Sequence, residues 1–174
     1  MPNLFVYCYG YGSSPKSDKV DRIRAKFPKD QVVAFTADVD PRIAVKYVSD
    51  SILDVLLNSP NDPGKLIIIG TSLGGWLASE LADQFAATAI LLNPASDPAK
   101  TLARYGVKED ILNVYTPISL KNLDRKRFYI DPDDEVIDHT ELLQTLPEEN
   151  VILSPGATHR FDGEEFEDML INIL

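Results

Sequence analysis

The chain has 174 residues, of which 44% are hydrophobic and 25% are charged, and its formal net charge at pH 7 is −10. This length is enough for one globular domain with a sizeable hydrophobic core, so we expect a single domain over residues 1–174. The negative charge argues against a nucleic acid or an anionic membrane surface as the main partner, because both would repel the protein. No stretch approaches the roughly 20 apolar residues of a membrane span.

The first apolar segment, residues 4–9, predicts a strand that contains the single cysteine, Cys8. One cysteine excludes an internal disulfide, and its place inside an apolar run predicts a small buried residue rather than a reactive thiol. The beginning of the sequence does not match a secretory signal, and we therefore expect a cytoplasmic protein.

A loop with two glycines, Gly10-Tyr11-Gly12-Ser13-Ser14-Pro15, follows that strand. It begins like a dinucleotide-binding fingerprint, but Pro15 stands where the third glycine would be, so the match is poor. The sequence also lacks a phosphate-binding loop of the type G-x-x-x-x-G-K-[ST]. Two histidines and one cysteine leave little for a zinc site. We therefore expect no cofactor and no metal.

Short apolar runs alternate with helix-compatible segments along the chain. Strands are predicted at residues 4–9, 31–36, 65–69, 88–92, 127–130 and 150–153, and helices at residues 17–26, 42–57, 73–84, 138–146 and 164–174. This alternation is typical of an α/β fold, here a three-layer α/β/α sandwich around a mostly parallel six-stranded sheet.

One connection, residues 93–126, is too long to join a strand directly to the next one. It carries Pro94 and Pro98 near its start. A partly helical excursion that forms a small cap over the site and a surface insertion without function are both compatible with this segment.

The most informative motif is Gly70-Thr71-Ser72-Leu73-Gly74-Gly75, which stands between a predicted strand and a predicted helix. A serine at the tip of such a turn takes a strained backbone conformation that leaves no room for neighbouring side chains, and Gly70 and Gly74 meet that demand. Ligands bind beyond the carboxyl ends of parallel strands, where Ser72 is predicted to lie. The motif predicts a nucleophile; the alternative is a glycine-rich turn that only permits close packing.

A serine nucleophile needs a base, and the base needs a third group that holds its tautomer. His159 is the predicted base because it lies in a loop between the last predicted strand and the last predicted helix. His139 stands at the start of a predicted helix in an acidic segment, where a first-turn or surface role is expected.

The acid should come from the loop after the preceding strand, residues 131–138, which contains four aspartates. Asp134 is favoured because the chain returns to apolar residues after it, and Asp133 is the alternative. A solvated acidic loop or a weak cation site is the alternative for the whole cluster. Acyl transfer also requires donors for the oxyanion, and the backbone amides of Leu73 and Tyr11 are the predicted ones.

The order Ser72, Asp134, His159 resembles that of the α/β-hydrolase superfamily. More narrowly, the chain is similar to the small bacterial YqiA/YcfP-like esterases in motifs that span nearly its whole length. The opening Tyr9-Gly10-Tyr11-Gly12-Ser13-Ser14-Pro15 resembles their H-G-F-x-S-S-P, and Gly70 to Gly75 their G-x-S-L-G-G. The remaining matches are Asn93-Pro94-Ala95 to N-P-A, Asp134-Glu135-Val136 to D-E-V, and Gly156-Ala157-Thr158-His159 to G-x-x-H.

This resemblance implies a minimal α/β-hydrolase fold that lacks the first two strands of the full fold. It also implies a serine triad and esterase or thioesterase activity on short acyl chains. It favours Asp134 over Asp133, since the family aspartate precedes Glu-Val. Tyr9 replaces the histidine of the family's H-G pair, a departure that bears on the oxyanion loop rather than on the triad.

The sequence therefore predicts a serine hydrolase for carboxylic esters or thioesters of small or short-chain acyl substrates, with Ser72, His159 and Asp134 as the triad. A noncatalytic binding protein that retains the hydrolase fold is the alternative from another class. A nucleotide-dependent enzyme that uses the Gly10–Gly12 loop is the third hypothesis.

Overall fold

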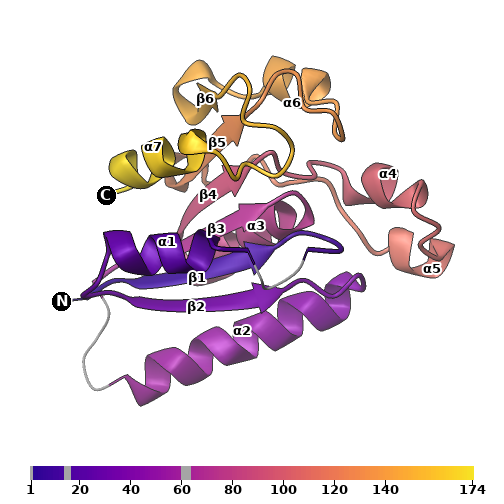
Figure 1. Ribbon diagram of the computed structural model, residues 1–174. Coiled ribbons are helices and arrows are strands. Elements are labelled where there is room, and N and C mark those ends of the chain that lie inside the picture. Colours follow the sequence, from indigo (N-terminus) through magenta and orange to yellow (C-terminus); the bar gives the residue numbers. More distant parts are fainter. Residues whose placement is uncertain (1, 14–16, 60–63) are drawn as a thin grey trace.

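The computed structural model describes residues 2–13, 17–59 and 64–174. Six strands form one sheet in the order β2-β1-β3-β4-β5-β6, and each neighbouring pair is parallel (Figure 1). The predicted α/β fold with a six-stranded sheet is confirmed. The strands are β1 (Leu4–Tyr9), β2 (Gln31–Thr36), β3 (Leu66–Thr71), β4 (Thr88–Leu92), β5 (Lys126–Ile130) and β6 (Val151–Leu153).

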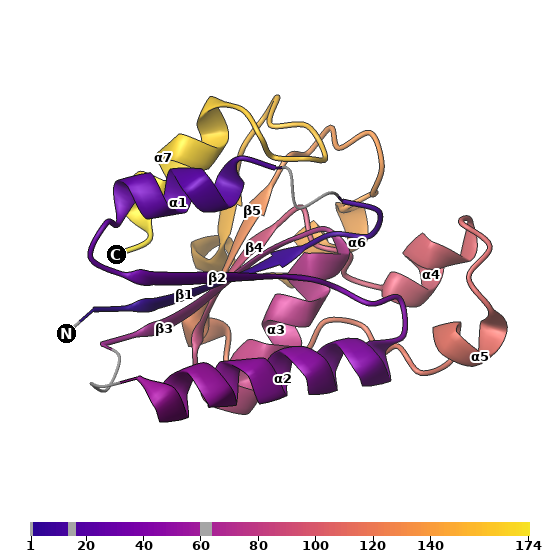
Figure 2. The same cartoon turned by 60° about the horizontal axis from the view of Figure 1, so that its bottom comes forward.

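Helices cover both faces of the sheet, as Figure 2 shows. One face is covered by α1 (Lys19–Lys26) and α7 (Glu164–Asn172), and the other by α2 (Pro41–Asn58) and α3 (Leu73–Phe85). The shorter elements are α4 (Pro98–Ala103), α5 (Glu109–Leu112), α6 (Thr140–Thr145) and the 3₁₀ turns η1 (Leu123–Arg125) and η2 (Glu148–Asn150). Within the described ranges, no helix is long and apolar enough to cross a membrane.

Strand β1 shows why the sequence favours two covered faces. Its six residues are all buried, with Leu4, Val6 and Cys8 in the core on the α2 and α3 side. The alternate residues Phe5, Tyr7 and Tyr9 lie in the core on the α1 and α7 side. Because successive side chains of a strand point to opposite faces, a strand that is covered twice reads as an uninterrupted apolar run.

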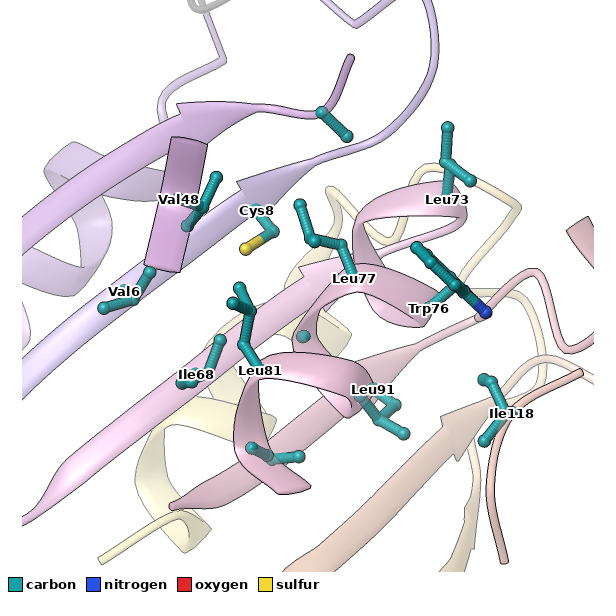
Figure 3. Packing of buried hydrophobic residues seen from close by; sticks show 14 of the residues in the cluster. Val6, Cys8, Val48, Ile68, Leu73, Trp76, Leu77, Leu81, Leu91 and Ile118 are labelled. Atoms are coloured by element: carbon teal, nitrogen blue, oxygen red, sulfur yellow. The ribbon is translucent and has the colours of Figure 1, made fainter. Parts of the chain in front are cut away.

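Cys8 is fully buried, as predicted. It lies near Val48 of α2 and Leu77 of α3 (Figure 3). Burial raises the pKa of the Cys8 thiol to about 12, because the thiolate would lose its hydration there. Cys8 is thus a small residue of the hydrophobic core.

The long connection 93–126 is packed against the rest of the domain. Nε1 of Trp76 donates to the carbonyl of Thr116 at 2.8 Å, and the Tyr115 hydroxyl donates to the carbonyl of Val39 at 2.7 Å. Helices α4 and α5 lie beyond the carboxyl ends of β1 and β2 in both views (Figures 1 and 2). The segment is therefore anchored near the edge of the sheet where ligands bind, and its role as a small cap stays a prediction.

Candidate active site

Ser72 stands at the turn between β3 and α3 with φ 56° and ψ −121°, a conformation that is strained for a residue with a side chain. A Cβ on Gly70 would run into the backbone of Gly74, and a Cβ on Gly74 would run into the carbonyl of Cys8. The two glycines thus let the turn approach its own strand and β1. The Ser72 amide donates to the carbonyl of Leu92 at 3.0 Å, which ties the turn to the end of β4.

A cavity of about 550 Å³ lies in front of Ser72. The loop after β1 contributes residues 10–13 to its lining, the end of β3 contributes Thr71 and Ser72, and the loop after β6 contributes His159 and Arg160. The structure therefore brings the predicted nucleophile and the predicted base to the same cavity, at the carboxyl edge of the parallel sheet.

Asp134 and His159 form a direct hydrogen-bonded pair. Nδ1 of His159 lies 2.9 Å from Oδ2 and 3.0 Å from Oδ1 of Asp134. The Asp134 side chain is fully buried, whereas 15% of the His159 side chain is exposed. Asp133, the alternative acid, is exposed to solvent. The carboxylate that faces His159 is thus that of Asp134.

Burial disfavours the charged form of Asp134, but hydrogen bonds from His139, from His159 and from the Val136 amide outweigh it and hold the pKa of this carboxyl well below its usual range. The ionised carboxylate can only accept hydrogen bonds. We therefore assign the proton of His159 to Nδ1, which leaves Nε2 as the acceptor. This is the tautomer that a general base requires.

The loop that carries His159 is fastened to the ends of two other strands. Nδ2 of Asn93, which follows β4, donates to the carbonyl of Thr158 at 2.7 Å, while its Oδ1 accepts from the Asp131 amide at 2.8 Å. Oδ2 of Asp131, which follows β5, accepts from the Thr158 amide at 2.9 Å. Thr158 has φ 59°, so these bonds hold the residue before His159 in a left-handed conformation.

Glu135 adds a further contact, because its carboxylate oxygens accept hydrogen bonds from the His159 amide at 3.1 and 3.3 Å. Sequence reasoning gave Asn93, Asp131 and Glu135 no individual role. The signal that points to Asn93 and Asp131 is their position: each is a polar residue placed directly after a buried strand.

The surface role expected for His139 is wrong. The residue does stand immediately before α6, as predicted, but it is only 3% exposed and its Nε2 lies 2.9 Å from Oδ2 of Asp134. The exposed position is taken instead by Asp138, whose carboxylate accepts from the Thr140 amide at 2.9 Å. Asp138 thus accepts from the first turn of the helix on the solvent side, while His139 is buried.

The two predicted oxyanion donors lie next to Ser72 in the chain and on the lining of the cavity, respectively. Leu73 opens α3, so its amide has no acceptor within the helix and belongs to the positive end of the helix dipole. Tyr11 lines the cavity on the loop after β1. That loop lies against the turn that carries Ser72, since a Cβ on Gly10 would meet the Thr71 carbonyl at 3.0 Å. Ser14 and Pro15 of the loop lie outside the described residues.

Solved structures with a similar fold include esterases and an alpha/beta hydrolase domain-containing protein. The chain aligns with Est1E from Butyrivibrio proteoclasticus at a TM-score of 0.70 and 15% identity, over 98% of this chain and 84% of that one. The esterase Pf2001 from Pyrococcus furiosus gives a TM-score of 0.70 at 17% identity, over 98% and 80%. The mouse alpha/beta hydrolase domain-containing protein 10 gives a TM-score of 0.65 at 16% identity, over 98% of this chain and 87% of that one.

At such low identity this likeness shows the fold, which is that of the α/β-hydrolases. The particular family follows from the sequence itself. Residues 4–174 match the model of the family described as Uncharacterised protein family (UPF0227), and the chain belongs to this family.

Proposed function

We propose that the protein is a serine hydrolase that cleaves carboxylic esters or thioesters of small or short-chain acyl groups. The observation that carries this proposal is the 2.9 Å contact between Asp134 and His159, together with a serine in a strained turn that lines the same cavity as His159. The esterases among the structural neighbours support it. A cytoplasmic location, suggested by the buried free Cys8, belongs to the same proposal.

In the proposed reaction, Oγ of Ser72 attacks the acyl carbon and its proton passes to Nε2 of His159. Asp134 stabilises the imidazolium through Nδ1. The tetrahedral intermediate then collapses: His159 gives the proton to the leaving alcohol or thiol, and the acyl group stays on Ser72. A water molecule, deprotonated by His159, attacks this acyl-enzyme and releases the carboxylic acid and free Ser72.

The negative charge that develops on the acyl oxygen would be held by the backbone amides of Leu73 and Tyr11. The Leu73 amide needs no reorganisation energy during the reaction, because the strained turn and the start of α3 fix its direction. The cavity volume of about 550 Å³ lies in the range of sites for small ligands, which agrees with a small acyl ester as the substrate.

The direct test is hydrolysis of p-nitrophenyl acetate by the wild type and by Ser72→Ala. Removal of a triad nucleophile typically lowers turnover by about 10⁴ to 10⁶, so the variant should have no measurable enzymatic rate. Ser51→Ala is the matched control, because Ser51 lies on α2 with its hydroxyl bonded to the Tyr47 carbonyl and should keep the wild-type rate. An active Ser72→Ala enzyme would rule out the proposed nucleophile.

A fluorophosphonate probe separates the hydrolase from a noncatalytic binding protein of the same fold. An activated serine reacts covalently with the probe, whereas an ordinary serine does not. We expect the wild type and Ser51→Ala to be labelled, with the modification on Ser72, and Ser72→Ala to stay unlabelled. An unlabelled wild-type protein would favour the binding protein.

A further inference from the structure

His139 and His159 share one carboxylate. Nε2 of His139 and Nδ1 of His159 both lie 2.9 Å from Oδ2 of Asp134. The two rings reach the carboxylate from different elements, one from the residue before α6 and the other from the loop after β6. Their surroundings also differ, because 1% of the His139 side chain and 15% of the His159 side chain are exposed. His139 is therefore separated from the cavity that His159 lines.

Apart from His159, whose Nδ1 contacts both oxygens of Asp134, the two oxygens have different partners. Oδ1 accepts from the amides of Val136 at 2.8 Å and Ile137 at 3.1 Å, which belong to the same loop. Among the described residues, Oδ2 is contacted only by the two histidine rings. Without His139, His159 would be the only hydrogen-bond partner of Oδ2 among these residues.

The proton positions follow from the charge of Asp134. Because the ionised carboxylate only accepts, the ring nitrogen that faces it must be a donor in each histidine, Nε2 in His139 and Nδ1 in His159. Nδ1 of His139 is buried and has no hydrogen-bond partner in the described part of the chain, so a proton there would gain no hydrogen bond. The two histidines are thus opposite tautomers that point at one acceptor.

We propose that His139 is a positioning residue, which acts through Asp134 to hold the carboxylate in the orientation that His159 needs. This inference rests on the proposed serine hydrolase function. His139 does not line the cavity that Ser72 and His159 share. Its bond to Oδ2, together with the amide bonds to Oδ1, fixes the rotation of the Asp134 carboxylate about its Cβ–Cγ bond. A small misplacement of a catalytic group can lower turnover by about 10²-fold, which sets the scale of the expected effect.

Two variants of His139 test this role by kinetics on p-nitrophenyl acetate. His139→Phe fills the site without a donor, and we expect kcat to fall by about 10- to 100-fold while KM stays within about twofold of the wild type. His139→Gln places an amide donor near the position of Nε2, so it should recover most of the lost kcat. Asp138→Ala is the control: it removes the cap of the Thr140 amide at the start of α6 without touching Asp134, and should keep the wild-type kcat.

Three results would overturn the proposal: a folded His139→Phe enzyme with wild-type kcat, a Gln variant no better than the Phe variant, or an equal loss of kcat in Asp138→Ala. The last result would mean that any disturbance of α6 acts in the same way, and thus that His139 has only a structural role. If His139→Phe does not fold, the kcat of His139→Gln and the tautomers of the two histidines, measured by nuclear magnetic resonance, decide.

Nuclear magnetic resonance of the imidazole nitrogens gives a readout that needs no substrate. The chain has only two histidines, so both rings can be assigned with His139→Gln as the reference. We expect the wild type to show a proton on Nε2 of His139 and on Nδ1 of His159, and the Nδ1 proton of His159 to persist in the Gln variant. A proton on Nδ1 of His139 would refute the proposal. If the wild type hydrolyses no ester and resists the fluorophosphonate, the proposed function fails, while the tautomers still decide whether His139 holds Asp134.

Discussion

The two sides of the candidate active site are built in different ways. The elbow, which is the turn around Ser72 between β3 and α3, requires residues without a side chain. Backbone atoms already occupy the space that a Cβ on Gly70 or Gly74 would need. The other side, around Asp134 and His159, is the polar side. It is held by hydrogen bonds, because side chains after β4 and β5 fasten the loop after β6. The first side should therefore be sensitive to added volume, and the second to the loss of a donor or an acceptor.

The largest effect on kcat is expected at Asp134, the candidate acid on the polar side. Asp134→Asn keeps the shape but presents an amide to His159, which favours the wrong tautomer; by analogy with other triads, kcat should fall by about 10⁴-fold. Asp133→Asn is the matched control, since Asp133 is exposed, and it should stay close to the wild type in the same ester assay. Equal losses in both variants would remove Asp134 from its proposed role.

The elbow is broken by one added methyl group. In Gly74→Ala the new Cβ would collide with the Cys8 carbonyl in β1, where neither backbone can move easily. We expect the free energy of unfolding to fall by about 3 kcal/mol or more, measured by urea denaturation. Gly163→Ala is the control, because Gly163 has φ −82° and its new Cβ would meet only the flexible end of Glu165. It should change stability by less than about 1 kcal/mol. Similar losses in both would show that the packing at Gly74 is not tight.

Loss of the buried amide of Asn93 breaks the polar side without removing a proposed triad member. Asn93→Ala leaves the Asp131 amide and the Thr158 carbonyl without their partner, which should cost about 2 to 3 kcal/mol of unfolding free energy. Asn122→Ala is a close control: Asn122 also has a positive φ, 54° against 41° for Asn93, but its side-chain bond to Asp83 is exposed. If the two variants lost equal stability, the backbone conformation rather than the buried hydrogen bonds would be the cause.

Lys19 sharpens the comparison because it adds a buried cation to the polar side. Its Nζ donates to the carbonyl of Arg160, beside His159, and burial lowers its pKa to about 8, against about 10.4 for an exposed lysine. Between these two values the unfolded chain binds more protons than the folded one, so stability rises with pH. Below about pH 8 the full cost of the buried charge is present.

We therefore expect the free energy of unfolding of the wild type, minus that of Lys19→Met, to rise by on the order of 2 kcal/mol from pH 8 to pH 10. The subtraction cancels the contributions of Cys8 and Tyr7, whose raised pKa values act in the opposite direction. Urea unfolding of both proteins at several pH values provides the measurement. A difference that does not change with pH would mean that folding does not lower the pKa of Lys19.

The sequence by itself determined the six strands, the longer helices and the elbow. Strand β1 was predicted at residues 4–9 and β4 at 88–92, as observed, and α3 ends one residue after its predicted end. These features are local: a doubly buried strand reads as an apolar run, and a turn without space for a Cβ requires glycine at fixed spacing. Ser72 could be selected for the same reason, because strain and glycines lie within three residues of it.

Only the tertiary structure decided how the candidate acid and the two histidines are arranged. Asp133 and Asp134 are neighbours of the same type, and what distinguishes Asp134 is a partner 25 residues away, His159. The burial of His139 likewise depends on which residue before α6 faces the solvent. Hydrogen bonds between loops leave no periodic pattern in the chain, since each requires only one polar atom at the right point in space.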